Sequence, residues 1–423
     1  MERGQPVVTG IAIAFIGYTS TFAAVLTGLR AVGASPAQAA SGLVALCAAL
    51  GVASLWLSRR CRMPITAAWS TPGAAVLASA GHVAGGWPAA VGGFLVAGAL
   101  VAVTGLWPRL GAKVAAIPAS IAQAMLAGVL LELCLVPVKA LGSHPWEVAP
   151  ILLTWLVAVV TAPRWAVPAA FGATVLVVGV LAVRGQGLHG PWLPQLALTG
   201  PRLSWAAVAG IALPLYVVTM AAQNVPGIAI MSSFGYRVPW RPAMVVTGLG
   251  SMLAAPFGGH AVNLAAISAA LPASPEAHPD PARRWLSSQA FGITYLGIAA
   301  GTTALISFLA VAPAEVVGTV AGLALLGTLG HALSAALGGG GESATGVPVA
   351  ERTAATVTFV VAASGTTLAG VSSAFWALLA GLVVRVAFSA QTRRSDPGPA
   401  AATAPEAGPG RAAREPVAEE ESA

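Results

Sequence analysis

The chain has little charge. Asp, Glu, Lys and Arg make up only 8% of its 423 residues, whereas 57% are hydrophobic. A soluble domain carries roughly 25% charged residues. Apolar runs of about 20 residues, the length that crosses a bilayer as a helix, recur between residues 7 and 388. This composition excludes a soluble globular domain and predicts a polytopic membrane protein.

Cysteine and aspartate are scarce as well. The three cysteines, Cys47, Cys61 and Cys134, lack the spacing of a metal site, and two of them lie inside apolar runs, where buried thiols are expected rather than disulfides. The two aspartates are Asp280 and Asp396, so paired acids for hydrolysis are missing. We therefore expect no enzyme activity, no metal and no cofactor.

Positive charge is present, with a net charge of +7, but it lies singly or in small clusters between the apolar runs. That distribution marks membrane topology and argues against nucleic-acid binding. The clusters at 59–62, 109–113, 237–241 and 283–284 fall on one side of the membrane if the N-terminus is cytoplasmic, as the positive-inside rule requires. We expect both termini to be cytoplasmic.

The apolar runs predict an all-α fold with about fourteen membrane segments. They cover 7–29, 36–57, 64–80, 87–106, 115–136, 148–162 and 165–183, then 204–226, 242–255, 256–272, 286–310, 313–336, 352–369 and 371–390. The run that opens at Gly10 begins much like the run that opens at Gly210, and a broken segment follows each. We expect two repeats, 1–200 and 201–390, inverted because seven is odd, and a disordered cytoplasmic tail over 391–423.

The third segment is broken by proline. Pro64 lacks an amide donor, and Pro72 disfavours helical geometry at Thr71. Ser70 or Thr71 followed by proline is typical of a helix start, with a hydroxyl N-cap and proline in the first turn. We expect extended backbone before Ser70 and a half-helix from about Thr71, with its electropositive N-terminus at the membrane midplane.

The tenth segment, 256–272, is broken in a similar way. The sequence predicts extended backbone over Pro256-Phe257-Gly258-Gly259 and a helix that restarts around His260 to Asn263, which would place both side chains on one helix face. Two half-helix N-termini that meet at the midplane form a site suited to an anion, especially a carboxylate. The alternative is a pair of kinks that only serves helix packing.

Polar and ionisable residues add candidates near these breaks. Gln223 and Asn224 end the eighth segment just before a proline, where they could bind a substrate or cap unwound backbone carbonyls; Tyr18 is a weaker counterpart in the first half. A histidine side chain can titrate in the physiological range, so His260 is the expected proton carrier, with Glu132 as a second candidate. Either could instead be hydrogen-bonded inside the protein.

Four motifs show a resemblance to a known family. They are residues 64–75, Gln223-Asn224-Val225-Pro226-Gly227, residues 255–266, and Pro275-Glu276-Ala277-His278-Pro279-Asp280-Pro281. In the order and spacing of these motifs, over most of residues 7–390, the chain resembles the benzoate:proton symporter (BenE-type) family. The resemblance implies a bacterial inner-membrane transporter with the 7+7 inverted-repeat fold of nucleobase and anion transporters. In that fold a core of segments 1–4 and 8–11 moves against a gate of segments 5–7 and 12–14.

The nucleobase transporters of that fold differ from this chain at one point. They carry acidic residues on the eighth and tenth segments, where this chain has Gln223, Asn224, His260 and Asn263. Missing carboxylates suit an anionic substrate, because like-charge repulsion is removed.

These patterns predict proton-coupled uptake of benzoate or a related aromatic carboxylate by alternating access, with Trp69 against the aromatic ring. The expected substrate-binding residues are Trp69, Ser70, Thr71, Gln223, Asn224, Gly258, Gly259, His260, Asn263 and Tyr18. The expected partners are this carboxylate, a proton and the lipid bilayer, with a homodimer as a candidate assembly. The alternatives are a nucleobase or inorganic-anion carrier, an anion channel and, more weakly, an intramembrane enzyme.

Overall fold

The computed structural model describes residues 4–107, 109–111, 118–186, 190–338 and 348–395, and it is almost entirely helical. Eight helices are long and apolar enough to cross a membrane: Gln5–Ala31, Pro36–Cys61, Gly86–Leu106, Ala119–Ser143, Pro163–Gly185, Trp205–Ser233, Pro281–Leu309 and Ala314–Leu337. Shorter apolar helices cover Pro145–Thr161 and Ser373–Phe388. A helical, multi-pass membrane protein is therefore confirmed, while the number of fourteen crossings stays a prediction.

The first half of the chain contains α1 (Gln5–Ala31), α2 (Pro36–Cys61), β1 (Ala67–Trp69), α3 (Thr71–Ala80), α4 (Gly86–Leu106), α6 (Ala119–Ser143), α7 (Pro145–Thr161), η1 (Pro163–Trp165), α8 (Ala166–Leu181) and η2 (Ala182–Gln186).

Local chemistry sets the ends of α2. Ser35 accepts a hydrogen bond from the Gln38 N–H, and the Gln38 side chain accepts one from the Ser35 N–H, so the two form a capping box. Arg62, with φ 53°, ends the helix in the left-handed region.

The second half opens with one long helical segment built from α9 (Trp205–Ala207), η3 (Val208–Ala212), α10 (Leu213–Thr219), η4 (Met220–Asn224) and α11 (Val225–Ser233). The elements after it are α12 (Trp240–Ala254), η5 (Ala255–Phe257), β2 (Val262–Leu264), η6 (Ile267–Ala269), α13 (Ala270–Ala273), η7 (Pro281–Arg283), α14 (Trp285–Leu309), α15 (Ala314–Leu337), α16 (Val349–Ala363) and α17 (Ser373–Ser395).

Two predicted ends are wrong. The eighth segment does not stop at Pro226: the helix continues to Ser233, because Pro226 lies in the first turn of α11, directly after the π-helical turn η4. At a change of helical register the missing proline N–H is tolerated. The predicted tail also begins too early, since α17 continues to Ser395. Residues 396–423 lie outside the described residues.

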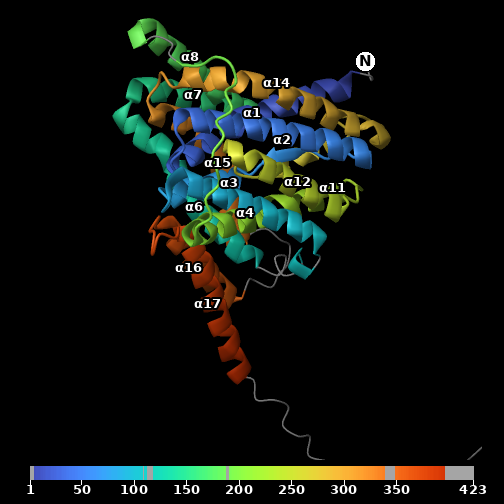
Figure 1. Cartoon of the computed structure of the whole chain (residues 1–423), viewed down its shortest axis with the longest axis vertical. Coiled ribbons are helices and arrows are strands. Elements are labelled where there is room, and N and C mark those ends of the chain that lie inside the picture. Colours follow the sequence, from blue (N-terminus) through green and yellow to red (C-terminus); the bar gives the residue numbers. More distant parts are fainter. Residues whose placement is uncertain (1–3, 108, 112–117, 187–189, 339–347, 396–423) are drawn as a thin grey trace, which may run out of the picture.

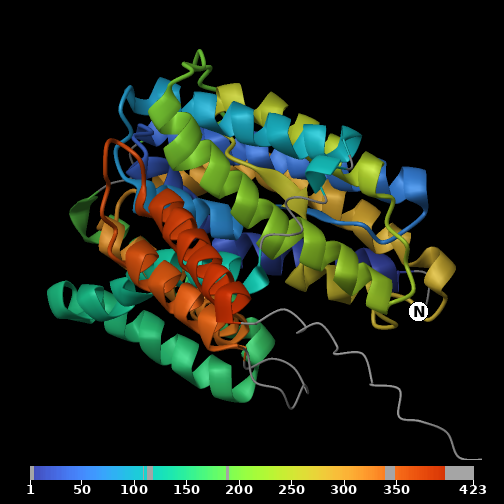
Figure 2. The same cartoon turned by 90° about the horizontal axis from the view of Figure 1, so that it is seen from below.

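The helices form two groups that meet along a shared face. Helices α1, α2 and α14 pack side by side (Figure 1), and α4 packs on α12. Helix α6 packs against α15 and α16, and α16 packs against α17. Helices α16 and α17, dark orange and red, lie at one side of the bundle (Figure 2). The groups touch where α1 meets α8 and α15, and where α3 meets α6. The division into repeats 1–200 and 201–390, and into a moving core and gate, stays a prediction.

Candidate functional site

The two broken segments pair with each other as a short antiparallel ribbon. Strand β1 lies against β2 with Ala68 opposite Asn263 and Trp69 opposite Val262. Backbone hydrogen bonds extend the pairing at both ends, from the Ser70 N–H to the Ala261 carbonyl (3.1 Å) and from the Ala265 N–H to the Thr66 carbonyl (2.9 Å). Segments almost two hundred residues apart are thus joined inside the protein.

Side chains from neighbouring helices cover the outer edges of this ribbon. Ser54 of α2 accepts the Ala67 N–H (2.9 Å), Ser251 of α12 accepts the Val262 N–H (2.8 Å), and Asn224 of η4 accepts the Leu264 N–H (2.8 Å). Non-helical backbone at membrane depth is tolerated only where protein or water satisfies its polar groups. These three buried side chains supply that partner from the protein itself.

Replacing Ser251 with alanine should therefore destabilise the fold. The change leaves the buried Val262 N–H without an acceptor, at a cost of about 1–3 kcal/mol. Ser79→Ala is the matched control, because within the described residues the Ser79 hydroxyl bonds only the Val76 carbonyl of its own helix. We expect thermal unfolding in detergent to show a clearly lower midpoint for Ser251→Ala than for Ser79→Ala. Equal midpoints would contradict the proposed support of the ribbon.

Helix α3 begins where the sequence predicts it. Ser70 is the N-cap, its hydroxyl accepts the Gly73 N–H (3.0 Å), and Pro72 lies in the first turn. The same hydroxyl accepts a hydrogen bond from Thr219 of α10 (2.8 Å). Ser70 is fully buried, while Thr71 is half-buried. Ser70 therefore joins α3, the segment 205–233 and, through its backbone, the second break.

The second break differs from the prediction. Residues 255–257 form the 3-10 turn η5 rather than extended backbone, and residues 262–264 form β2 rather than helix. Helical structure resumes only at Ile267, in η6 and the four-residue α13. The reason is non-local: Val262 to Leu264 find strand partners in β1. His260 and Asn263 consequently do not share a helix face, and a second long half-helix is not formed there.

Gly258 and Gly259 have backbone reasons for being glycine. Gly258 adopts φ 96°, which favours glycine, and its carbonyl lies so close to α2 that a Cβ on Gly42 would meet it at 2.5 Å. A Cβ on Gly259 would lie 2.6 Å from that of Ala254. Both glycines therefore allow the turn between α12 and β2 to pack tightly. Their predicted contact with substrate stays a proposal.

His260 connects the two breaks. Its ring is fully buried and its Nε2 lies 2.9 Å from the Ser70 carbonyl oxygen. A carbonyl only accepts, so Nε2 donates and Nδ1 carries the lone pair. Nδ1 is buried and has no partner within the described residues. The ring also packs edge-on against Phe94 of α4, with centroids 6.4 Å apart.

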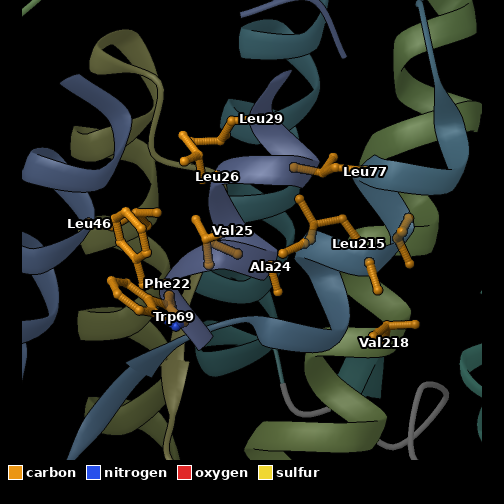
Figure 3. Packing of buried hydrophobic residues seen from close by; sticks show 14 of the residues in the cluster. Phe22, Ala24, Val25, Leu26, Leu29, Leu46, Trp69, Leu77, Leu215 and Val218 are labelled. Carbon is orange, nitrogen blue, oxygen red and sulfur yellow. The ribbon is translucent and has the colours of Figure 1, made fainter. Parts of the chain in front are cut away.

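The two faces of the ribbon have different chemistry, because side chains alternate along a strand. Trp69 belongs to one face. It is 3% exposed, donates its indole N–H to Thr21 (2.7 Å), and packs against Tyr18 and Tyr295 with centroids 5.7 and 6.0 Å away. Figure 3 shows it beside Phe22 of α1. The ring predicted to meet substrate is thus enclosed by protein aromatic groups.

The other face carries unpaired polar atoms. Asn263 lies on this face opposite Ala68, and Thr66 lies on the same face two residues before Ala68. The Thr66 hydroxyl and the Asn263 Oδ1 are buried and have no hydrogen-bond partner within the described residues, although Asn263 Nδ2 donates to the Leu264 carbonyl (2.7 Å). Unsatisfied buried polar atoms are rare in folded proteins and indicate a place for a ligand or water. This face is the better candidate for substrate contact.

The remaining predicted residues are spread around the ribbon. Asn224 was expected to bind substrate or to cap a backbone carbonyl; in the structure it instead accepts a hydrogen bond from the backbone amide of Leu264. Gln223, beside it, is half-buried and makes no side-chain hydrogen bond within the described part of the chain. Tyr18 pairs with Thr302 (3.1 Å). Glu132 is exposed on α6, on a face turned away from the packed interior, and its role as a second proton site stays a prediction.

Sequence reasoning missed Ser54, Ser251, Thr66 and Thr219. Each is a small hydroxyl residue inside an apolar run, and such residues usually bond their own helix, as Ser79 does. The signal that could have found Ser251 is its position five residues before Pro256, which places it one turn before the break. Across the described ranges, no group of three or more His, Cys, Asp or Glu is placed to hold a metal ion.

Comparison with known proteins decides the family. The sequence profile of the benzoate membrane transport proteins (BenE) matches residues 3–387. The chain belongs to this family. Inner membrane protein YdcO of Escherichia coli (strain K12) is 40% identical over 387 residues, 89% of this chain and 94% of that protein. The benzoate membrane transport protein of Acinetobacter baylyi is 29% identical over 344 residues, 78% of this chain and 82% of that protein.

Solved structures share the fold of this BenE-family chain. The transmembrane domain of the cyanobacterial bicarbonate transporter BicA has a TM-score of 0.60 at 16% identity and covers 89% of this chain and 97% of its own. The murine anion transporter Slc26a9 in its inward-facing state has a TM-score of 0.64 at 11% identity, with 92% and 68% covered. These findings confirm the family resemblance. The chain is a multi-pass membrane transporter, rather than an enzyme, with the fold of the SLC26 and BicA proteins.

Proposed function

We propose that this chain takes up benzoate or a related aromatic carboxylate together with a proton, by alternating access. The observation that carries the proposal is the β1–β2 ribbon, where two interrupted segments meet beside the capped N-terminus of α3. Interrupted segments of two repeats are where secondary transporters of inverted-repeat folds bind substrate. Membership of the benzoate transport family supports the substrate class.

The polar face of the ribbon supplies the groups for a carboxylate. The Thr66 hydroxyl can donate a hydrogen bond, and the unpaired amide of Gln223 lies on η4, which packs against β2 and α6. The positive end of α3 is connected to the same segment, because Thr219, one turn before Gln223, bonds the N-cap residue Ser70. Carboxylate side chains are missing from this set, so an anion meets no like charge here.

The proton is assigned to His260. Its buried Nδ1 is free to take a proton, but the resulting charge would then need an acceptor, because an unpaired buried charge is costly. An anionic substrate that binds at the polar face of the ribbon lowers that cost. Proton and carboxylate would therefore favour each other's binding, which is the reciprocal linkage that a symporter requires.

The location and movement of the chain belong to the same proposal. A relative is named an inner membrane protein, and we place this chain in the bacterial inner membrane with both termini cytoplasmic. The face along which α1 and α3 meet α8, α15 and α6 is where a core of segments 1–4 and 8–11 would move against the remaining segments. A homodimer is the proposed assembly.

Counterflow in proteoliposomes tests the substrate. Labelled benzoate outside should exchange against unlabelled benzoate trapped inside, and should not exchange against trapped uracil or bicarbonate. Neutral benzoic acid crosses bilayers unaided, so protein-free liposomes set the baseline. Exchange driven by trapped uracil would indicate a nucleobase carrier, and exchange driven by trapped bicarbonate would indicate an inorganic-anion carrier. Flux that does not saturate with concentration would indicate a channel.

A further inference from the structure

A groove is lined by residues that lie outside the ribbon. It is formed where α2 ends and α12 begins, and it encloses about 650 Å³. Its lining includes Trp56, Arg60, Met63, Arg237, Pro239 and Pro242. Neither the substrate site nor the proton site uses any of these residues.

The groove is positively charged without an internal counter-ion. Arg60 and Arg237 are exposed, and neither forms an ion pair in the described ranges, where the ion pairs are His144–Glu315 and Arg283–Asp280. The lining contains no acidic residue. The first turn of α12 also lacks acidic residues, so its positive end adds to the potential.

The groove is also amphipathic. Trp56 is 47% exposed, and Met63 and the two prolines complete an apolar wall next to the arginines. Tryptophan and arginine at the end of a membrane helix are typical of the depth at which phospholipid headgroups lie. A basic pocket between membrane helices at this depth is suited to an anionic headgroup.

We propose that this groove binds an anionic phospholipid of the phosphatidylglycerol type. Arg60 and Arg237 would contact the phosphate, and Trp56 with Met63 would contact the glycerol and the first acyl carbons. The apolar wall favours a lipid over free phosphate, which would leave that wall exposed to water. The proposal does not depend on which substrate the transporter carries.

Binding of acyl-labelled phosphatidylglycerol to the full-length protein in detergent micelles, followed by fluorescence anisotropy, tests the site. Combining Arg60→Gln with Arg237→Gln should raise the Kd about 25-fold, from roughly five-fold per arginine. The control combines Arg164→Gln with Arg184→Gln, two exposed arginines of η1 and η2, which do not line the groove, and should change the Kd less than about two-fold.

Competitors separate the possible ligands. Unlabelled phosphatidylglycerol should displace the probe, whereas phosphatidylcholine and millimolar inorganic phosphate should not. Displacement by phosphatidylcholine, displacement by phosphate alone, or equal loss in the control variant would each overturn the proposal. Should the double variant fail to fold, the single variant Arg237→Gln gives the same test, with an expected loss of about five-fold.

Discussion

Replacing His260 with glutamine is expected to abolish benzoate accumulation driven by a proton gradient while leaving counterflow close to that of the wild type. The ring connects the two broken segments through one hydrogen bond from Nε2 to the Ser70 carbonyl. A glutamine amide N–H can donate the same bond, but it does not titrate in the physiological range. The substitution therefore removes proton binding and keeps the contact.

His260→Ala separates the two roles. Alanine removes both the titrating group and the donor to Ser70, so it should lose accumulation and also reduce counterflow, because the N-cap of α3 loses a partner. The measurement compares accumulation above the protein-free baseline with exchange at equal pH on both sides. Gradient-driven accumulation that survives in His260→Gln would show that another group carries the proton.

Glu132→Gln is the companion to this experiment. Glu132 is exposed on α6 and forms no ion pair within the described residues. Its exposure makes it the lesser candidate, and we expect its variant to retain accumulation. The reverse result, loss in Glu132→Gln and retention in His260→Gln, would transfer the coupling role to α6.

The sequence predicted the first break better than the second for a physical reason. Ser70, Thr71 and Pro72 specify a helix start through contacts within one turn, so local reading placed the start of α3 correctly. At Gly258 and Gly259 the sequence also indicated that the preceding helix ends. The strand conformation of the residues after these glycines, however, depends on pairing with β1, and no local signal at Val262 to Leu264 shows that pairing.

The candidate site shows the same limit. His260 and Gln223 stood out because ionisable and amide groups are rare in apolar runs. The alternation that turns Trp69 away from Asn263, and the side chains that hold the ribbon edges, follow from its register. In the sequence, nothing distinguishes Thr66 from other small polar residues; the structure shows that its buried hydroxyl has no hydrogen-bond partner within the described residues. Composition and motifs thus indicate the class of protein and the region, and the fold decides which atoms are free.

A negative charge introduced at position 223 is expected to have the second large effect, a rise in the KM for benzoate. Gln223→Glu places a carboxylate on η4, beside β2, where the proposed anionic substrate lies. Two unit charges about 4 Å apart repel by roughly 4 kcal/mol at a surface-like dielectric constant, and greater separation lowers this. We therefore expect the KM for benzoate counterflow to rise about 30-fold or more at pH 8.

Acid should reverse this loss, because protonation of the introduced carboxyl removes its charge. Gln223→Glu should recover counterflow as both sides are taken from pH 8 toward pH 5.5, relative to wild type at the same pH. Gln223→Met is the matched control: it removes the amide at similar size and adds no charge, so it should lose less and show no recovery. If Gln223→Met is as defective as Gln223→Glu at pH 8, the amide itself binds and charge is irrelevant. If neither variant is defective, the substrate lies away from η4, and the polar face of the ribbon must be assigned to another role.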